Sequence, residues 1–474
     1  MKRSMDRLGD FVTGRKQVYE EGRVRLSPAY VVPLSFLFVI ILGTILLMLP
    51  FASASGEMTD PVTALFTATT ATCVTGLVVE DTYAYWSLAG QIIILILIQL
   101  GGLGIISFTS MVLLASHKKF SLQDRKLLID AMNLDMGHGL LSFLVKVFKW
   151  TFIVEGLGAC LYSIEFIPRY GIINGIWYSV FTAISAFCNA GIDILGPDSL
   201  ISFNKDSGVL FITMFLIIMG GLGYVVWFDV SRAVKLGIKN RYTPMQTIKR
   251  FGVHTKLVLF LTFVLIAVGM LIVFPAEYNN PGTMADMGLK DKIVNSLFQS
   301  VTFRTAGFAA VPQQELNSVS VLIGYILMLI GGSPIGTAGG VKTVTFFIVV
   351  MNVVVFMRGQ KEAIVFKSRI TEELMRKAAA ILTVSIAVAF TGTLFILLTN
   401  NVNMEDSLFE VISAVATVGL SRAVTPTLNV FGRIVIICVM YLGRIGPISL
   451  VLFFAGKKSG KDRIEYAEGK FYVG

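Results

Sequence analysis

The tetrapeptide Cys73-Val74-Thr75-Gly76 closes a short apolar stretch with a small polar cluster, and three similar clusters follow it along the chain. They are Cys188-Asn189-Ala190-Gly191, Arg304-Thr305-Ala306-Gly307 and Ala416-Thr417-Val418-Gly419. Their glycines are separated by 115, 116 and 112 residues. Such regular spacing indicates a fourfold internal repeat. Four glycine-bearing loops in one chain predict a single central pore that receives one loop from each quarter.

The composition places these loops in a membrane protein. Of the 474 residues 55% are hydrophobic and only 15% charged, and the mean hydropathy is +0.75. Runs such as Val31–Leu49, Ser87–Ala115 and Leu257–Phe274 are long enough to cross about 30 Å of hydrocarbon at ~1.5 Å per helical residue. The sequence therefore predicts an all-α polytopic membrane protein.

The net charge of +10 is distributed as a topology signal rather than as a nucleic-acid surface. Lys and Arg gather in alternate segments between the apolar runs, whereas the intervening loops are acidic or mixed. The basic segments are Lys2–Arg25, His117–Lys126, Arg232–Lys256, Arg358–Arg376 and Lys457–Arg463. Cytoplasmic segments of membrane proteins carry such an excess of positive charge. We therefore expect both termini in the cytoplasm, lipid as the surrounding partner and no nucleic acid.

Each quarter of the chain is predicted to hold an outer helix (M1), a short re-entrant pore helix, a loop and an inner helix (M2). Eight spanning helices and four re-entrant pore loops put every basic segment on one face of the membrane. The expected units are a cytoplasmic N-terminus (1–29), repeat 1 (30–117), a linker with repeat 2 (118–235), a linker with repeat 3 (236–357), a linker with repeat 4 (358–456) and a cytoplasmic tail (457–474).

The pore helices are predicted near residues 61–72, 175–187, 292–303 and 405–416. About 12 residues reach only ~18 Å, which is too short to span a bilayer. Asp60-Pro61 is a good start signal, and acidic residues stand near the third and fourth starts. A helix that enters from outside points its negative end at the membrane centre, where it favours a cation. One such loop could equally serve helix packing, whereas four in phase favour a pore.

A second glycine motif follows each loop glycine by 24 to 29 residues, near the middle of the predicted inner helix. The copies are Gly101-Gly102-Leu103-Gly104, Gly220-Gly221-Leu222-Gly223, Gly331-Gly332-Ser333-Pro334 and Gly443-Arg444-Ile445-Gly446. Glycine at such positions lets a helix bend or lets two helices pack closely. The residues alone leave both interpretations open.

The third copy departs most from the others, because residues 331–340 contain five glycines and a proline. Such a stretch should break the inner helix in mid-membrane, and non-helical backbone at that depth must line protein or a water-filled cavity. We interpret it as a gate. The gate candidates are Gly331, Gly332, Ser333, Pro334, Gly336, Thr337, Ala338, Gly339, Gly340 and, from the fourth inner helix, Arg444.

Arg444 is a guanidinium midway along an apolar helix, where a charge usually faces a cavity and carries function. Below the loops it would act as an electrostatic barrier to cations. The alternative is a structural ion pair, for which Glu155 is a candidate partner, or a cap on backbone carbonyls. Arg304, just before the third loop, is interpreted as a brace for its pore helix.

From about Tyr30 to Gly456 the pattern resembles the Trk/Ktr/HKT superfamily of potassium transporters, and within it the KtrB branch. Four loop glycines, an interrupted third inner helix and an arginine in the fourth inner helix carry the resemblance. It implies K⁺ uptake across a bacterial plasma membrane, with partly dehydrated K⁺ held by loop carbonyls. The implied selectivity-filter residues are Val74, Thr75, Gly76, Asn189, Ala190, Gly191, Thr305, Ala306, Gly307, Thr417, Val418 and Gly419.

The resemblance also implies partners. KtrB-like proteins are homodimers on a cytosolic, KtrA-like ring of RCK subunits that bind ATP or ADP, and Na⁺ often stimulates their uptake. We expect no cofactor on this chain itself, K⁺ as the transported ion and Na⁺ as a coupling or activating ion. The gate would be the 331–340 segment together with Arg444.

Two other functions were weighed. An ammonium or sodium permease would use the same pore architecture. An integral-membrane enzyme would need paired carboxylates, a His cluster or a metal spacing, and the three histidines and four cysteines show none of these. We therefore expect a transporter rather than an enzyme.

Overall fold

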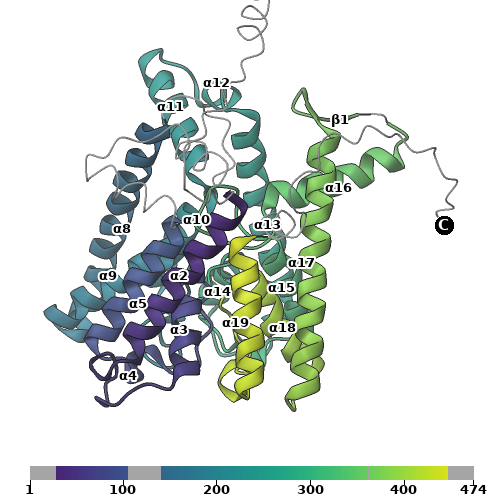
Figure 1. Ribbon diagram of the computed structural model, residues 1–474. Helices are drawn as coiled ribbons and strands as arrows, with labels where there is room; N and C mark the ends of the chain where they lie inside the picture. The colour runs from purple at the N-terminus through teal and green to yellow at the C-terminus, as the bar shows by residue number, and fades with distance from the viewer. Residues whose placement is uncertain (1–27, 105–139, 361, 447–474) are drawn as a thin grey trace, which may run out of the picture.

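The computed structural model describes residues 28–104, 140–360 and 362–446, and within these ranges helices dominate (Figure 1). The outer helices of the four predicted quarters are α2 (Pro28–Met48), α8 (Leu140–Tyr170), α13 (Val253–Glu277) and α17 (Glu372–Thr399). Among the described helices, α2, α13 and α17 are each long and apolar enough to cross a membrane, and one bent pair also qualifies if counted as a single span. Of the predicted terminal units, residues 1–27 of the N-terminus (1–29) and the whole of the tail (457–474) lie outside the described residues.

The four pore helices are α3 (Pro61–Cys73), α9 (Ile172–Cys188), α14 (Leu289–Thr302) and α18 (Met404–Val415). Asp60 caps α3 as predicted, accepting hydrogen bonds from the backbone N–H groups of Val62 (3.1 Å) and Thr63 (3.0 Å). The other acidic starts are not caps. The residue that caps α18 is Asn403, and the acidic residues of α14 and α18 lie inside the first turn.

The inner spans begin with α5 (Leu88–Leu103), α10 (Ser207–Leu222), α15 (Ser318–Leu329) and α19 (Val430–Ile445). A continuous inner helix was expected in every repeat except the third, and this is wrong for the second. There α10 ends at Gly223, and the chain turns by 97° into α11 (Tyr224–Lys239). The cause is a backbone φ of 86° at Gly223, which a right-handed helix cannot contain.

The helices α5 and α19 also end at a glycine with positive φ, since Gly104 and Gly446 have φ values of 84° and 86°. The first glycine of the motif has the other role, that of close packing. A Cβ on Gly101, Gly220 or Gly443 would overlap a carbonyl at the end of the pore helix of the same repeat. Bending and close packing, the two interpretations left open by the sequence, therefore both apply, at different glycines of one motif.

In the third repeat the predicted interruption is present, since residues 330–342 separate α15 from α16 (Thr343–Met357). A small antiparallel hairpin of β1 (Ala363–Val365) and β2 (Ser368–Ile370) then precedes α17. The all-α expectation omitted this hairpin. It lies at the same end of the molecule as α11 and α12 (Pro244–Lys249), whereas α4 (Thr82–Tyr85) lies at the opposite end (Figure 1). Four 3-10 turns complete the described elements, at Pro50–Ala52, Ile201–Phe203, Gln313–Glu315 and Thr425–Thr427.

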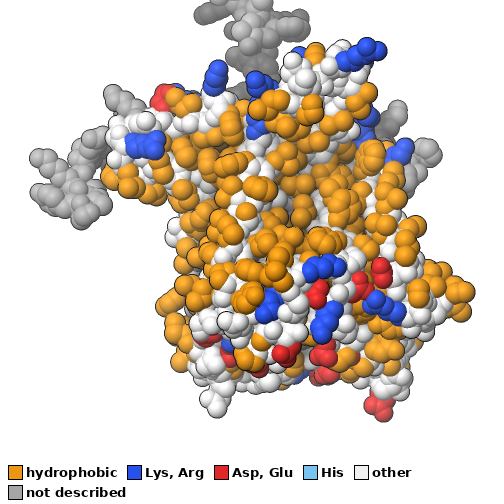
Figure 2. Space-filling model, turned by 180° about the vertical axis from the view of Figure 1, so that it is seen from behind, with side chains coloured by type: hydrophobic (Ala, Val, Ile, Leu, Met, Phe, Trp, Pro, Cys, Tyr) orange, Lys and Arg blue, Asp and Glu red, His pale blue; other side chains and the backbone are white. Residues whose placement is uncertain are grey.

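The pore helices form the centre of the molecule and the outer helices cover them. One phenylalanine in each pore helix is fully buried: Phe66, Phe181, Phe298 and Phe409. In contrast, large apolar side chains on the outer helices are exposed, such as Phe38 at 67% and Phe263 at 73%. Figure 2 shows a broad apolar belt around one face of the molecule, with charged residues gathered above and below it. A contiguous apolar surface of this kind is suited to contact with lipid.

Candidate ion pathway: four loops above an interrupted helix

The four loops share one backbone conformation. The residue two places before each glycine is in the left-handed region, with φ of 56° at Val74, 59° at Asn189, 64° at Thr305 and 50° at Thr417. The glycines also have positive φ: 103° at Gly76, 63° at Gly191, 84° at Gly307 and 96° at Gly419. These positive φ angles end each pore helix and turn the chain sharply into the loop that follows.

The four glycines meet in a closed ring. A Cβ built on Gly76 would lie 3.0 Å from the Cα of Gly419 and 3.2 Å from that of Gly191. A Cβ on Gly307 would likewise lie 2.8 Å from the Cα of Gly191 and 3.3 Å from that of Gly419. Each glycine therefore touches its two neighbours in chain order, and the fourth touches the first. The structure brings all four sequence-predicted loops to one axis.

Hydroxyl groups of the pore helices brace the loops from behind. The Thr70 and Ser413 hydroxyls accept hydrogen bonds of 3.0 Å from the N–H groups of Gly76 and Gly419. In the third repeat the Thr302 hydroxyl donates to the Phe308 carbonyl at 2.6 Å, and Ser185 donates to the matching Ile192 carbonyl in the second. Sequence reasoning missed these braces, although their regular placement five or six residues before each glycine could have indicated them.

Polar atoms around the ring are left without protein partners. Within the described part of the chain, the Oγ1 atoms of Thr75, Thr305 and Thr417 and the Nδ2 atom of Asn189 are buried and form no hydrogen bond. Buried polar groups are nearly always hydrogen-bonded, so each exception asks for an explanation such as an ion or a water molecule. The other predicted loop residues, Ala190, Ala306 and Val418, are fully buried.

The interrupted segment of the third repeat, residues 331–340, packs directly against two of the loops. The Thr337 hydroxyl donates to the Phe187 carbonyl at 3.0 Å and to Asn189 Oδ1 at 3.2 Å. A Cβ on Gly339 would overlap the hydroxyl of Thr417. The gate candidates thus contact the second and the fourth loop.

The segment is also paired to the broken end of α10. Ser333 N–H donates to the Gly221 carbonyl at 2.9 Å, and Thr337 N–H donates to the Gly220 carbonyl at 3.1 Å. Pro334 and Gly336 lie against Gly223. At its stem, Gly331 N–H donates to the Val341 carbonyl at 3.0 Å, next to Gly332 and Gly340. Because these contacts are mostly backbone hydrogen bonds, the segment has a defined position despite its glycines.

Three cations, the buried Arg304 and the half-buried Lys342 and Arg444, donate to carbonyls of this segment. Arg444 Nη1 donates to the Thr337 carbonyl at 2.8 Å, and Lys342 Nζ donates to the Ala338 carbonyl at 2.5 Å. The weakest contact joins Arg304 Nη2 to the Gly331 carbonyl at 3.5 Å. Arg444 also reaches the first repeat, through a 2.5 Å hydrogen bond from Nη2 to the Gly101 carbonyl. Arg444 therefore caps carbonyls, which is one of the two structural alternatives that the sequence left open beside an electrostatic barrier.

The suggested pairing of Arg444 with Glu155 is wrong. The Glu155 carboxylate accepts hydrogen bonds of 3.1 and 3.2 Å from Gln99 Nε2, and Cys188 Sγ lies 3.9 Å from it. The sequence could not rank these partners, because Gln99 and Cys188 come from different repeats. The role expected for Arg304 also changes, since its hydrogen bond goes to the interrupted segment rather than to its own pore helix.

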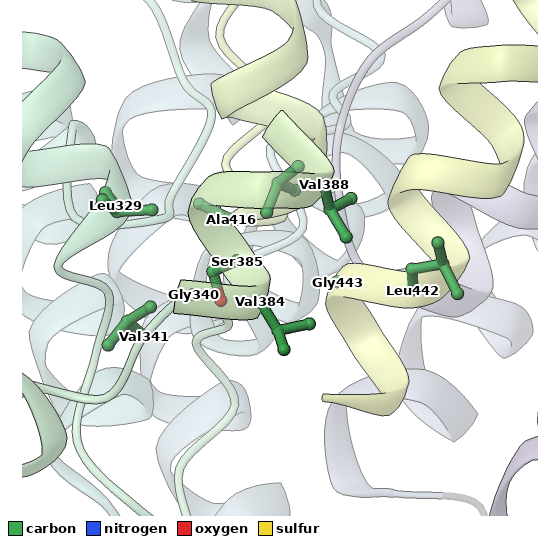
Figure 3. Close-up of a pocket in the computed structure, with 10 residues that line it drawn as sticks. Leu329, Gly340, Val341, Val384, Ser385, Val388, Ala416, Leu442 and Gly443 are labelled. Carbon is green, nitrogen blue, oxygen red and sulfur yellow. The ribbon is translucent and has the colours of Figure 1, made fainter. Parts of the chain in front are cut away.

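A small cavity of about 20 Å³ lies beside the stem of the segment. Figure 3 shows the apolar side chains of Leu329, Val388 and Leu442 around it, contributed by α15, α17 and α19. Gly340 and Val341 form its wall on the side of the segment. The stem therefore borders unfilled apolar space rather than a fully packed core.

A buried carboxylate binds the residues that follow the fourth loop, and the sequence analysis did not predict it. Glu410 of α18 is 1% exposed. It accepts hydrogen bonds from the Ser421 hydroxyl (2.7 Å) and from the N–H groups of Arg422 (3.3 Å) and Thr425 (2.9 Å), and also from the Thr425 hydroxyl. Arg422 Nη1 donates to the Gln313 carbonyl at 3.0 Å and so joins this network to the third repeat.

We expect Glu410→Gln to destabilise the protein by about 2 kcal/mol, because hydrogen bonds to a charged group contribute ~1.5–3 kcal/mol and an amide cannot accept from all four donors. The measurement is the midpoint of thermal unfolding of the purified protein in detergent. Glu405→Gln is the matched control. Glu405 is 41% exposed and its Arg422 contact is 3.4 Å, so its loss should cost less than ~1 kcal/mol. Equal midpoints for the two variants would contradict the bracing role.

These features define a class of protein: a helical membrane protein with four pore-loop repeats around one axis. The family model TrkH, described as a cation transport protein, matches residues 25–463, and the chain belongs to this family. The predicted helical membrane fold, apart from the short β1–β2 hairpin, and the resemblance stated above are thereby confirmed. The chain is a transport protein rather than an enzyme.

Named relatives cover nearly the whole chain. It is 38% identical to "Ktr system potassium uptake protein B" of Bacillus subtilis over 451 residues, which cover 95% of this chain and 98% of that protein. It is 34% identical to "Potassium/sodium uptake protein NtpJ" of Enterococcus hirae, again covering 95% and 98% of the two chains. The crystal structure of the potassium transporter TrkH from Vibrio parahaemolyticus superposes with a TM-score of 0.67 at 15% identity, covering 93% of this chain and 86% of that one.

Proposed function

We propose that this protein takes up K⁺ through the ring of four glycines. The observation that carries the proposal is the closed contact of Gly76, Gly191, Gly307 and Gly419, because such close approach leaves backbone carbonyls as the groups available to an ion. Rings of backbone carbonyls replace the hydration shell of K⁺ in selectivity filters. The names of the relatives from Bacillus subtilis and Enterococcus hirae support potassium as the ion.

The carbonyls of the residues that precede each glycine are the proposed ligands. In the first loop these residues are Val74 and Thr75. The four pore helices support cation binding, because each ends just before its loop and the C-terminal end of a helix is negative. The unpartnered threonine hydroxyls beside the ring would complete a polar, partly hydrated site. Na⁺ is proposed as a coupling or activating ion rather than as the main cargo.

Passage is proposed to be controlled by the 331–340 segment and Arg444. The segment lies below two loops and is held by Arg444 through the Thr337 carbonyl. A guanidinium close to the path would repel a passing cation. Opening then requires the segment and Arg444 to move apart.

The protein is proposed to work as a homodimer in the plasma membrane, on a cytosolic ring of RCK subunits that bind ATP or ADP. Support comes from the name of the Bacillus subtilis relative, which assigns that protein to a system rather than to a single chain. Of the predicted basic segments, the two that the structure describes, Arg232–Lys256 and Arg358–Arg376, lie at the end of the molecule with α11, α12 and β1 (Figure 1). The positive-inside rule supports a cytoplasmic location for this end.

The test is flux into liposomes that contain the purified protein. We expect uptake of ⁸⁶Rb⁺ that K⁺ abolishes, that Na⁺ and NH₄⁺ inhibit at least about tenfold less well, and that a co-reconstituted RCK ring makes dependent on nucleotide. Effective competition by NH₄⁺ would favour the ammonium permease instead. Liposomes that remain impermeant with and without the ring would overturn the proposal. Growth rescue of a strain deficient in K⁺ uptake, with and without Na⁺, is the cellular counterpart.

A further inference from the structure

A second, smaller cavity lies beside the second and third loops, whose residues Asn189 and Arg304 line it. Its free volume is about 10 Å³, close to the minimum that one water molecule needs. Its walls come from α10, α13, the end of α14 and Gly332 of the interrupted segment. Most of the lining from α10 is apolar, so any polar group that faces the cavity is poorly solvated.

Three polar side chains line this cavity, and each has an atom without a partner. The atoms are Asn189 Nδ2, Thr262 Oγ1 and Arg304 Nε, and none forms a hydrogen bond within the described residues. The side chains are 1%, 8% and 8% exposed, respectively. Leaving one such group unpaired costs about 1–3 kcal/mol. Three of them around one small cavity indicate a missing ligand rather than three separate defects.

The chemistry of the three atoms defines that ligand. An amide Nδ2 and a guanidinium Nε can only donate hydrogen bonds, whereas a threonine hydroxyl can donate or accept. We infer that the cavity binds one small hydrogen-bond acceptor, either a halide ion or a water molecule. The ligand would join Asn189 of the second loop to Arg304 of the third.

The charge of Arg304 favours the halide, although chloride and bromide are larger than water and the cavity walls would have to move outward slightly to admit either ion. Its one hydrogen bond within the described residues is the weak 3.5 Å contact with the Gly331 carbonyl, and no acidic side chain among those residues forms an ion pair with it. An isolated charge in a low-dielectric interior is costly unless it is paired. A halide would accept from all three groups and also neutralise the guanidinium. Water would satisfy the hydrogen bonds alone.

A ligand in this cavity would also affect the proposed ion pathway. Asn189 contacts Thr337 through its other side-chain atom, at 3.2 Å, and Gly332 borders the same cavity. A bound acceptor would therefore fix the back of two loops and one end of the interrupted segment together. Loss of the ligand would weaken the connection between these loops and the interrupted segment, but it would not alter the ring of glycines directly.

The direct test is a structure of the full-length protein at about 2 Å resolution in chloride, repeated after exchange into bromide. We expect a density peak within hydrogen-bond distance of Asn189 Nδ2, Thr262 Oγ1 and Arg304 Nε. An anomalous bromide signal at the peak identifies a halide site, and an unchanged peak without that signal identifies a water molecule. A cavity without a peak in either salt would overturn the inference.

Thr262→Val gives a second test, because valine keeps the shape of threonine but cannot hydrogen-bond. We expect the peak to fall to less than half its wild-type height in this variant. Thr393→Val is the matched control, since Thr393 is a buried threonine of α17 whose hydroxyl is already bonded to the Ala389 carbonyl. A peak of wild-type height in Thr262→Val would also count against the site. Neither result depends on ion selectivity, so failure here leaves the transport proposal standing.

Discussion

Gly76→Ser is expected to lower K⁺ uptake by at least about tenfold and to raise the share of Na⁺ among the ions that enter. A Cβ at this position would lie 2.5 Å from the Ala190 carbonyl and 3.0 Å from the Cα of Gly419. Overpacking of this kind costs about 1–3 kcal/mol, and ~1.4 kcal/mol is a factor of ten in rate. The displaced carbonyl would belong to the proposed K⁺ ligands, so selectivity should change together with rate.

The measurement is ⁸⁶Rb⁺ and ²²Na⁺ uptake into liposomes, normalised to the amount of protein inserted. Gly56→Ser is the matched control. Gly56 also has a positive φ, 73°, but no atom lies within 4 Å of a Cβ built on it. It therefore carries the backbone strain of the substitution without the steric clash. If Gly76→Ser transported as well as Gly56→Ser and with the same ion preference, the ring would not be the filter.

Arg444→Gln is expected to raise K⁺ flux in the absence of any cytosolic partner, by about tenfold. Arg444 donates to the Thr337 carbonyl of the interrupted segment and to the Gly101 carbonyl of α5, and so connects the segment to the first repeat. Hydrogen bonds of charged groups contribute about 1.5–3 kcal/mol. If the closed conformation loses ~1.4 kcal/mol of stability relative to the open one, the ratio of open to closed protein rises tenfold. Removal of the positive charge acts in the same direction, because it lowers the barrier to a cation.

Leak of ⁸⁶Rb⁺ from liposomes without RCK subunits measures this effect. Arg433→Gln provides the control. Arg433 is on the same helix and also donates to two carbonyls, those of Leu428 (3.1 Å) and Pro426 (3.3 Å). It lies at the N-terminal end of α19, whereas Arg444 lies at the C-terminal end. Arg433→Gln should leave the leak unchanged. A leak that stays at the wild-type level in Arg444→Gln would show that neither the charge nor the tether limits passage.

The sequence was sufficient for the features that repeat. The four pore helices, the Asp60 cap and the convergence of the four glycines all follow from hydropathy and from a motif present four times. Periodicity reveals these because the same physical requirement, a short helix ending in positive φ, acts in every quarter. The interruption at residues 331–340 could be predicted for a different reason, namely that five glycines and a proline cannot sustain a helix.

Contacts between repeats could not be predicted. Arg444 bonds Gly101, which is 343 residues away, and no periodicity connects a side chain of the fourth repeat with a carbonyl of the first. Glu410 was overlooked because it occurs in one repeat only. The bend at Gly223 was missed because φ is a property of the folded chain, and a Gly-Gly-Leu-Gly run also fits a straight, closely packed helix.

The positive φ of Gly223 divides the second inner span into two helices, α10 and α11, whose directions differ by 97°. The loops near the end of α10 are held by buried hydroxyl groups of the pore helices. If the proposed cytosolic partner pulls on α11, the backbone can rotate at Gly223, and the loops need not move with that helix. Ion recognition and the proposed regulation would then use separate parts of one chain.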